Sequence, residues 1–235
     1  MKQQLSVPML AARATFYKIL GALALMGVVE GALFHLGLSR SSGLESAFDN
    51  GFIPLIFRCS FIAIFILLIS WNKDTNTRYT IRRLAVSERA FTLWNALYGI
   101  LIFLILWGVQ LGFALLLCKY YLLSADPASI NQQTVFLAFY RSDFLHSLLP
   151  LAEVSRWVRQ FAFVITLGVC SACAPCLSRR NYKPFAALLP YILFVALFDR
   201  PVGDVALDAI LTLGLLTITT YALWCCWEEA TDDEA

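Results

Sequence analysis

Residues 80–98, TIRRLAVSERAFTLWNALY, form a basic, patterned segment between two long apolar stretches of the chain. Its first half alternates arginines with aliphatic residues, so a short helix there has an apolar side and a cationic side. Ser87 followed by Glu88 is typical of a helix start, because the hydroxyl accepts an orphan backbone N–H and the carboxylate complements the helix dipole. The sequence therefore predicts a second helix that begins at Glu88, outside the membrane, and enters the bilayer near Leu97.

The composition indicates an integral membrane protein. Hydrophobic residues make up 60% of the 235 residues, charged residues only 14%, and the mean hydropathy is +0.71. A net charge of +2 gives no reason to expect a nucleic-acid partner. Six apolar stretches are expected to span the membrane: residues 19–38, 52–71, 97–122, 157–177, 184–198 and 205–227. We therefore predict an all-α membrane protein whose residues 1–235 form a single transmembrane domain, without a soluble domain.

The segments between the spans carry most of the charges. Residues 1–18 mix basic and apolar side chains, which predicts an interfacial helix on the cytoplasmic surface. Residues 72–96 are expected to be a cytoplasmic segment, residues 123–156 an extracytoplasmic loop, and residues 228–235 an acidic cytoplasmic tail. This arrangement places both termini in the cytoplasm, with a helical outer loop between spans three and four.

Part of that outer loop, residues 134–151, is almost apolar enough to be a span. It carries Arg141, Asp143 and His146 near its centre, and burying these groups in lipid is unfavourable. An interfacial or partly re-entrant helix is therefore expected there.

The distribution of basic residues supports this orientation. Eleven lysines and arginines flank the spans on the side of the N-terminus, against six on the opposite side. Because cytoplasmic loops are enriched in Lys and Arg, both ends are placed at the cytoplasmic face of the cell membrane. The same rule leaves a simpler interpretation of residues 80–98 open, as an ordinary positively charged cytoplasmic loop.

Catalytic and metal-binding motifs are scarce. The chain has no GxxxxGK[ST] loop to hold nucleotide phosphates and no HExxH motif, and its only histidines are His35 and His146. Cys170, Cys173 and Cys176 form a CxxCxxC pattern on a predicted helix, for which helix packing is favoured over metal binding. We predict no catalytic residues, no metal site and no cofactor bound by this chain.

Two intramembrane charges stand out among those in the predicted spans. Glu30 and Arg58 have similar depths in spans one and two, so they are expected to form an intramembrane polar pair. A structural role for this pair is favoured over contact with a substrate. A second polar set is a candidate cavity or gate near the outer side: Asp208, Arg141, Asp143 and His146.

The topology and the segment RRLAVSERAFTLWNALYG together resemble the ABC-2 type permeases of bacterial ABC transporters. The resemblance implies that this segment is a coupling helix that docks on an ATPase subunit. The implied coupling residues are Arg82, Arg83, Leu84, Val86, Ser87, Glu88 and Arg89. Ala85 stands where the family often has a proline, and Glu88 is inserted among the basic positions.

The resemblance also implies partners and a function. The chain would be the permease subunit of an ATP-driven exporter for an amphipathic peptide, lipid or drug. ATP and Mg²⁺ would bind a separate cytoplasmic ATPase subunit, and a second permease copy or a homologous permease would complete the pathway within the membrane lipid.

Other function classes stay open at this point. The chain could be the substrate-capture subunit of an energy-coupling importer, in which Gly21, Ala24, Gly27 and Gly31 would offer a small-residue docking face. It could also be a membrane scaffold without transport activity. An intramembrane enzyme would need a polar pair, which only Glu30 and His35 could begin to provide, and their spacing of five fits one helix face poorly.

Overall fold

The structure of the chain is a computed structural model that describes residues 6–38, 43–49, 51–73, 87–124, 132–151, 153–179, 185–200 and 205–232. Every element within these residues is a helix. The helices are α1 (Ser6–Leu38), α2 (Leu44–Phe48), α3 (Phe52–Lys73), α5 (Glu88–Ser124), α6 (Gln132–Arg141), α7 (Asp143–Leu148), α8 (Val154–Arg179), α9 (Phe185–Leu197) and α10 (Val205–Asp232).

Five of these helices, α1, α3, α5, α8 and α10, are long and apolar enough to cross a membrane. This confirms the prediction of an all-helical protein with the character of a multi-pass membrane protein. The predicted span 184–198, the fifth of the six, corresponds to α9, which has only 13 residues. At about 1.5 Å per residue α9 is roughly 20 Å long, shorter than the roughly 30 Å hydrocarbon core of a bilayer.

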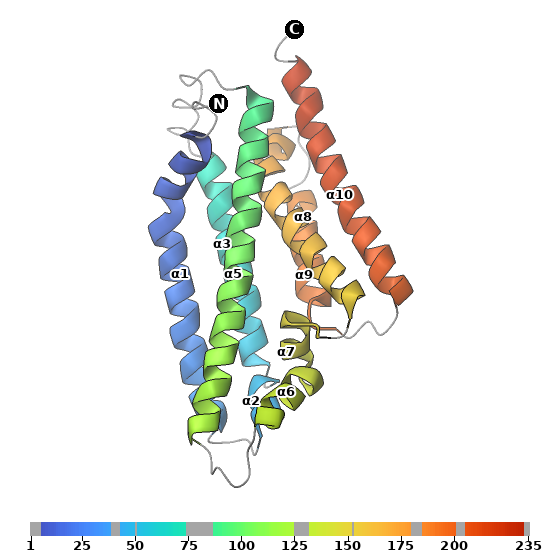
Figure 1. The fold of residues 1–235 in the computed structure, drawn as a ribbon. Helices are drawn as coiled ribbons and strands as arrows, with labels where there is room; N and C mark the ends of the chain where they lie inside the picture. Colours follow the sequence, from blue (N-terminus) through green and yellow to red (C-terminus); the bar gives the residue numbers. More distant parts are fainter. Residues whose placement is uncertain are drawn as a thin grey trace.

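The helices form an elongated bundle with two different ends (Figure 1). The first turn of α1 and the last turn of α10 lie at one end, which we call the terminal end. The short helices α2, α6 and α7 lie at the other, which we call the α6–α7 end. Helices α8 and α10 begin at a level inside the bundle, and α6 and α7 occupy the space beyond them (Figure 1).

The first helix differs from its prediction. We expected an interfacial helix over residues 1–18 and a separate span from residue 19, but α1 continues without a break from Ser6 to Leu38. Pro8 does not interrupt it, because the first four N–H groups of a helix have no intrahelical partner to lose. Alanines at 11, 12 and 14 then favour continuation of the helix.

The segment 134–151 also differs from its prediction as one helix. It divides at Ser142, whose side chain accepts a hydrogen bond from the Leu145 backbone N–H at 3.3 Å and caps α7. Serine favours such a cap position because its hydroxyl satisfies an otherwise orphan donor. The result is two short helices at the α6–α7 end in place of one continuous helix.

The predicted helix start at Glu88 is confirmed. Helix α5 begins at Glu88, and the Ala90 backbone N–H donates to the Ser87 hydroxyl at 3.4 Å.

Helix α8 is the centre of the bundle. In its most apolar stretch 78% of the residues are buried, against 22–39% in the other four long helices. It packs against α3, α5, α9 and α10. It approaches α5 closely where a Cβ atom on Gly168 would lie 2.6 Å from the backbone nitrogen of Ile100. Glycine at this position therefore allows the two backbones to meet.

A cluster of phenylalanines fixes the short helix α9. The Phe194 ring lies 4.4 Å from that of Phe61 and 5.8 Å from that of Phe163, measured between ring centroids. Phe61 also stacks on Phe103 at 5.4 Å. These four rings come from α3, α5, α8 and α9 and are almost completely buried, so α9 is joined to the core through Phe194.

Candidate functional site

A cavity of about 530 Å³ lies toward the α6–α7 end, and we call it the charged cavity. It is lined by Asp49, Gly51, Pro54, Arg58, Asp143, Phe144, Val195, Ala196, Asp199 and Arg200. These residues come from the start of α3, the start of α7, the end of α9 and the segments beside them. The volume falls in the range of about 300–1,000 Å³ typical of ligand pockets.

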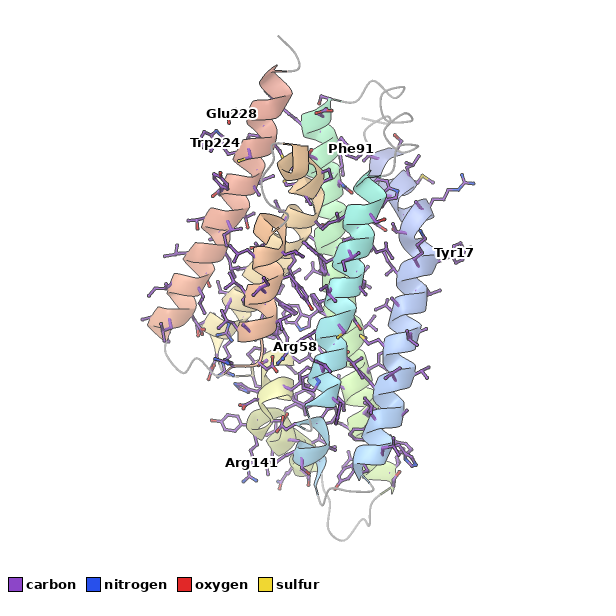
Figure 2. The ribbon with its side chains drawn as sticks, turned by 180° about the vertical axis from the view of Figure 1, so that it is seen from behind. Tyr17, Arg58, Phe91, Arg141, Trp224 and Glu228 are labelled. Atoms are coloured by element: carbon purple, nitrogen blue, oxygen red, sulfur yellow. The ribbon has the colours of Figure 1, made fainter. Side chains whose placement is uncertain are left out.

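An ion pair joins two walls of the charged cavity. The Arg58 guanidinium on α3 donates from Nη2 to Asp199 Oδ2, just after α9. Arg58 lies on the part of α3 nearer the α6–α7 end (Figure 2). The Tyr191 hydroxyl donates to the Arg58 carbonyl at 3.1 Å, which adds a second link between α3 and α9. Both charged side chains are partly exposed, Arg58 by 25% and Asp199 by 18%.

The predicted pair of Glu30 and Arg58 does not form. Glu30 is fully buried and accepts a hydrogen bond at 2.9 Å from the Gln110 side-chain amide of α5. The prediction matched only the depths of the two residues in the membrane. Depth leaves the rotation of each helix about its axis undetermined, and α1 turns Glu30 toward α5 while α3 turns Arg58 toward α9.

A second ion pair is sealed in the bundle between α8 and α10. Arg159 Nη1 donates to Asp208 Oδ1 at 2.5 Å, and the side chains are 0% and 5% exposed. Asp208, predicted to face a cavity or gate, is therefore held by Arg159 and is not among the residues that line the charged cavity. Next to Arg159, the Gln160 amide donates to the Phe198 carbonyl at 3.1 Å.

These contacts form one polar layer through the bundle. Phe198, which accepts from Gln160, directly precedes Asp199, which binds Arg58. Five of the buried side-chain polar atoms that find no partner among the described residues belong to this layer: Arg58 Nε, Asp199 Oδ1, Gln160 Oε1, Arg159 Nε and Arg159 Nη2. Such groups are unfavourable in a dry interior, so this layer is the part of the bundle best suited to water or a polar ligand.

The sequence analysis missed Arg159 and Gln160 as site residues. A signal for Arg159 was present, since it falls inside the predicted span 157–177. We counted it among the charges of the outer loop, although an arginine within a span needs a buried partner.

The other residues of the predicted cavity or gate lie in different surroundings. Asp143 lines the charged cavity. Arg141 is exposed and lies 3.6 Å from Glu45 of α2. His146 is buried, with Nε2 at 3.8 Å from Glu153 Oε1. Of the four predicted residues, only Asp143 therefore reaches the cavity.

Carboxylates gather at the α6–α7 side of the charged cavity. Asp49 accepts a hydrogen bond from the Ser142 hydroxyl at 2.7 Å. Loss of solvent around the carboxyl raises the pKa of Asp49, and the negative charges of Asp143 and Glu45 raise it further. The hydrogen bonds from Ser142 and from the Phe144 backbone act in the opposite direction.

The cysteine pattern does not assemble a metal site in the described residues. Cys170 and Cys173 are buried, free thiols in the hydrophobic core around α8, and the side chain of Cys176 lies outside the description. Within the described ranges, no three His, Cys, Asp or Glu side chains come together as metal ligands. Glu30 and His35 also lie in different surroundings, because Glu30 is buried against Gln110 whereas His35 is exposed.

The predicted coupling residues are described only in part. Ser87, Glu88 and Arg89 are exposed at the start of α5, whereas Arg82, Arg83, Leu84 and Val86 lie outside the described residues. The charged cavity and the start of α5 are thus at opposite ends of the bundle (Figures 1 and 2). Comparison of the chain with models of protein families, with curated proteins and with solved structures finds no match.

Proposed function

We propose that this chain is the membrane-spanning permease subunit of an ATP-driven ABC exporter. In this proposal α9 also spans the membrane and completes a set of six spans, both termini are cytoplasmic, and a separate ATPase subunit binds ATP and Mg²⁺. The observation that carries the proposal is that the end of α3 and the start of α5 both lie at the terminal end, opposite the charged cavity. The predicted coupling residues 82–89 fall at and before the start of α5 in the sequence.

The length of α5 supports a role in coupling. With 37 residues it is about 55 Å long, well beyond the roughly 30 Å hydrocarbon core. Its first two residues, Glu88 and Arg89, are exposed and therefore suited to contact a cytoplasmic partner. Farther along, Gly99 packs against Gly168 of the central helix α8. A displacement of the start of α5 by an ATPase would thus be passed to the helix that contacts most of the bundle.

The coupling step is tested with Leu84→Asp in the chain co-expressed with an ABC ATPase that co-purifies with the unsubstituted chain. If residues 82–89 dock on the ATPase, an acid at this apolar position should prevent co-purification and abolish stimulation of ATPase turnover. Interface energy is concentrated in a few central residues, so Leu84→Asp should have a larger effect than Arg82→Gln. Thr75→Asp, in the same connection but outside the docking residues, is the matched control.

Normal ATPase retention by the Leu84→Asp protein would reduce residues 80–98 to an ordinary basic loop and remove the main support for the exporter. Membrane insertion should be unchanged in every variant, because the substituted positions lie outside the bilayer in the proposed topology.

The six-span topology has its own test. Single cysteines at positions 75 and 181, in a protein without its native cysteines, should be shielded from a membrane-impermeant thiol reagent in intact cells. A cysteine at position 129 should react. Labelling at position 181 from outside the cell would contradict the six-span topology.

The charged cavity favours a second candidate, the substrate-capture subunit of an energy-coupling importer. Its volume suits a vitamin-sized ligand, and its position at one end suits capture from one side of the membrane. The predicted small-residue docking face of this candidate is incomplete, because Gly27 is packed against the Phe113 ring whereas Gly21 faces open space. In an importer, Gly21→Leu should disrupt assembly with the scaffold and Leu84→Asp should not.

A further inference from the structure

We propose that the charged cavity binds amphipathic organic cations. The cationic group would be held between Asp49 and Asp143, and the apolar part would lie against the wall formed by Pro54 and Val195. Binding of such a cation would be a property of this chain alone. That the cation is also the transported substrate rests on the proposed function.

The charge of the lining favours a cation. The described residues that line the cavity include three carboxylates and two guanidinium groups. One carboxylate and one guanidinium group neutralise each other, because Arg58 and Asp199 form an ion pair. Asp49 and Asp143 then face a single remaining cation, Arg200, so the cavity carries an excess of negative charge.

The two free carboxylates have no cationic partner of their own. Among the described residues, Asp49 is hydrogen-bonded by the neutral Ser142 hydroxyl, and neither Asp49 nor Asp143 forms an ion pair. The nearby cation Arg141 lies beside Glu45 instead. A bound ligand cation would relieve the repulsion among these carboxylates, which an anion would increase.

Part of the cavity wall is apolar. Pro54, Phe144, Val195 and Ala196 contribute hydrocarbon surface from α3, α7 and α9. A small inorganic cation would leave this wall in contact with water, whereas an organic cation with hydrophobic groups would cover it. Apolar surface and excess negative charge in one cavity of about 530 Å³ together select an amphipathic cation.

The binding test uses two probes of similar shape and opposite charge, tetraphenylphosphonium and tetraphenylborate. The full chain is purified into lipid nanodiscs, and binding above that of empty nanodiscs is measured by equilibrium dialysis. Tetraphenylphosphonium should bind saturably, and tetraphenylborate should bind at least about tenfold more weakly, because each interaction with the excess negative charge changes sign. Equal binding of the two ions would overturn the proposal.

Three variants locate the site. Asp49→Asn with Asp143→Asn should weaken tetraphenylphosphonium binding by about tenfold or more, and Arg200→Gln should strengthen it. Glu228→Gln is the matched control, since this exposed acid lies at the opposite end of the molecule (Figure 2). All substituted residues are exposed, and an unchanged elution volume in size-exclusion chromatography checks that each variant is folded.

Undiminished binding by the double variant would place the cation elsewhere and overturn the proposal. The outcome is separate from that of the exporter test, because no ATPase is present. A chain with Leu84→Asp should bind tetraphenylphosphonium normally, even if it no longer retains an ATPase.

Discussion

The bundle contains two ion pairs of the same chemical type in different surroundings. Arg159 and Asp208 join α8 to α10 and are almost completely buried. Arg58 and Asp199 join α3 to the end of α9 and remain partly exposed beside the charged cavity. The presence of a charged residue inside the bundle therefore does not by itself indicate a functional site. A sealed pair can act only through its partner, whereas a pair on a cavity wall can also meet water or a ligand.

The largest difference between the pairs should come from removing one acid. Asp208→Asn would leave Arg159 as a buried, uncompensated charge, at a cost of about 3–5 kcal/mol in the free energy of unfolding. Replacing both residues by leucine should recover most of this loss, because neither charge then remains buried. Reversible unfolding of the purified protein in mixed micelles measures both variants. A double variant as unstable as Asp208→Asn would show that the pair stabilises by more than mutual compensation.

The same change at the cavity should cost less. Asp199→Asn leaves Arg58 with access to the cavity, so its charge can be hydrated, and a loss of about 1–2 kcal/mol is expected, between exposed and buried pairs. Helix α9 should also stay in place, because Phe194 is buried among other rings and the Phe198 carbonyl is bound by Gln160. A loss equal to that of Asp208→Asn, in the same unfolding assay, would mean that the two environments do not differ.

Local features of the fold could be predicted from the sequence, because they depend on neighbouring residues. The cap at Ser87 and the start of α5 follow from two adjacent residues, and the five long apolar helices follow from composition. The division between α6 and α7 at Ser142 had the same kind of signal, a serine followed by an aspartate, but the apolar run around it suggested one helix.

The partners of the buried charges could not be predicted, because they depend on how each helix is rotated. The depths of Glu30 and Arg58 agree, yet their side chains point to different neighbours. Asp208 belongs to the polar set predicted near the outer side, but Arg159 lies 49 positions away in the sequence, and the two meet only in the assembled bundle. The charged cavity likewise joins segments that are distant in sequence.

Acid should weaken cation binding in the charged cavity. The raised pKa of Asp49 means that this carboxyl takes up a proton at a higher pH than an ordinary aspartate. Tetraphenylphosphonium binding depends on the ionised form, so its affinity should be complete well above that pKa and fall by several-fold as the pH is lowered through it. Dialysis across a pH series measures this change, with elution volume as the control for folding. Affinity that rises toward low pH would contradict the role of Asp49.

The smallest effect is expected at a third buried polar contact, between Glu30 of α1 and Gln110 of α5. This contact involves one amide donor and one carboxyl oxygen, without an opposite charge, and hydrogen bonds between membrane helices contribute about 0.6 kcal/mol on average. A double-mutant cycle with Glu30→Leu and Gln110→Leu, measured by unfolding in mixed micelles, should therefore give a coupling energy of about 0.6 kcal/mol. Glu30→Gln, which keeps an oxygen that can accept from Gln110, should change stability less than Glu30→Leu.

A coupling energy as large as that of a buried ion pair would contradict this prediction and would mean that Glu30, like Asp208, contributes strongly to the stability of the bundle. A small coupling energy would mean that the Arg159–Asp208 pair between α8 and α10 is stronger than the contact between Glu30 and Gln110. That order is consistent with the deeper burial of α8 than of α1.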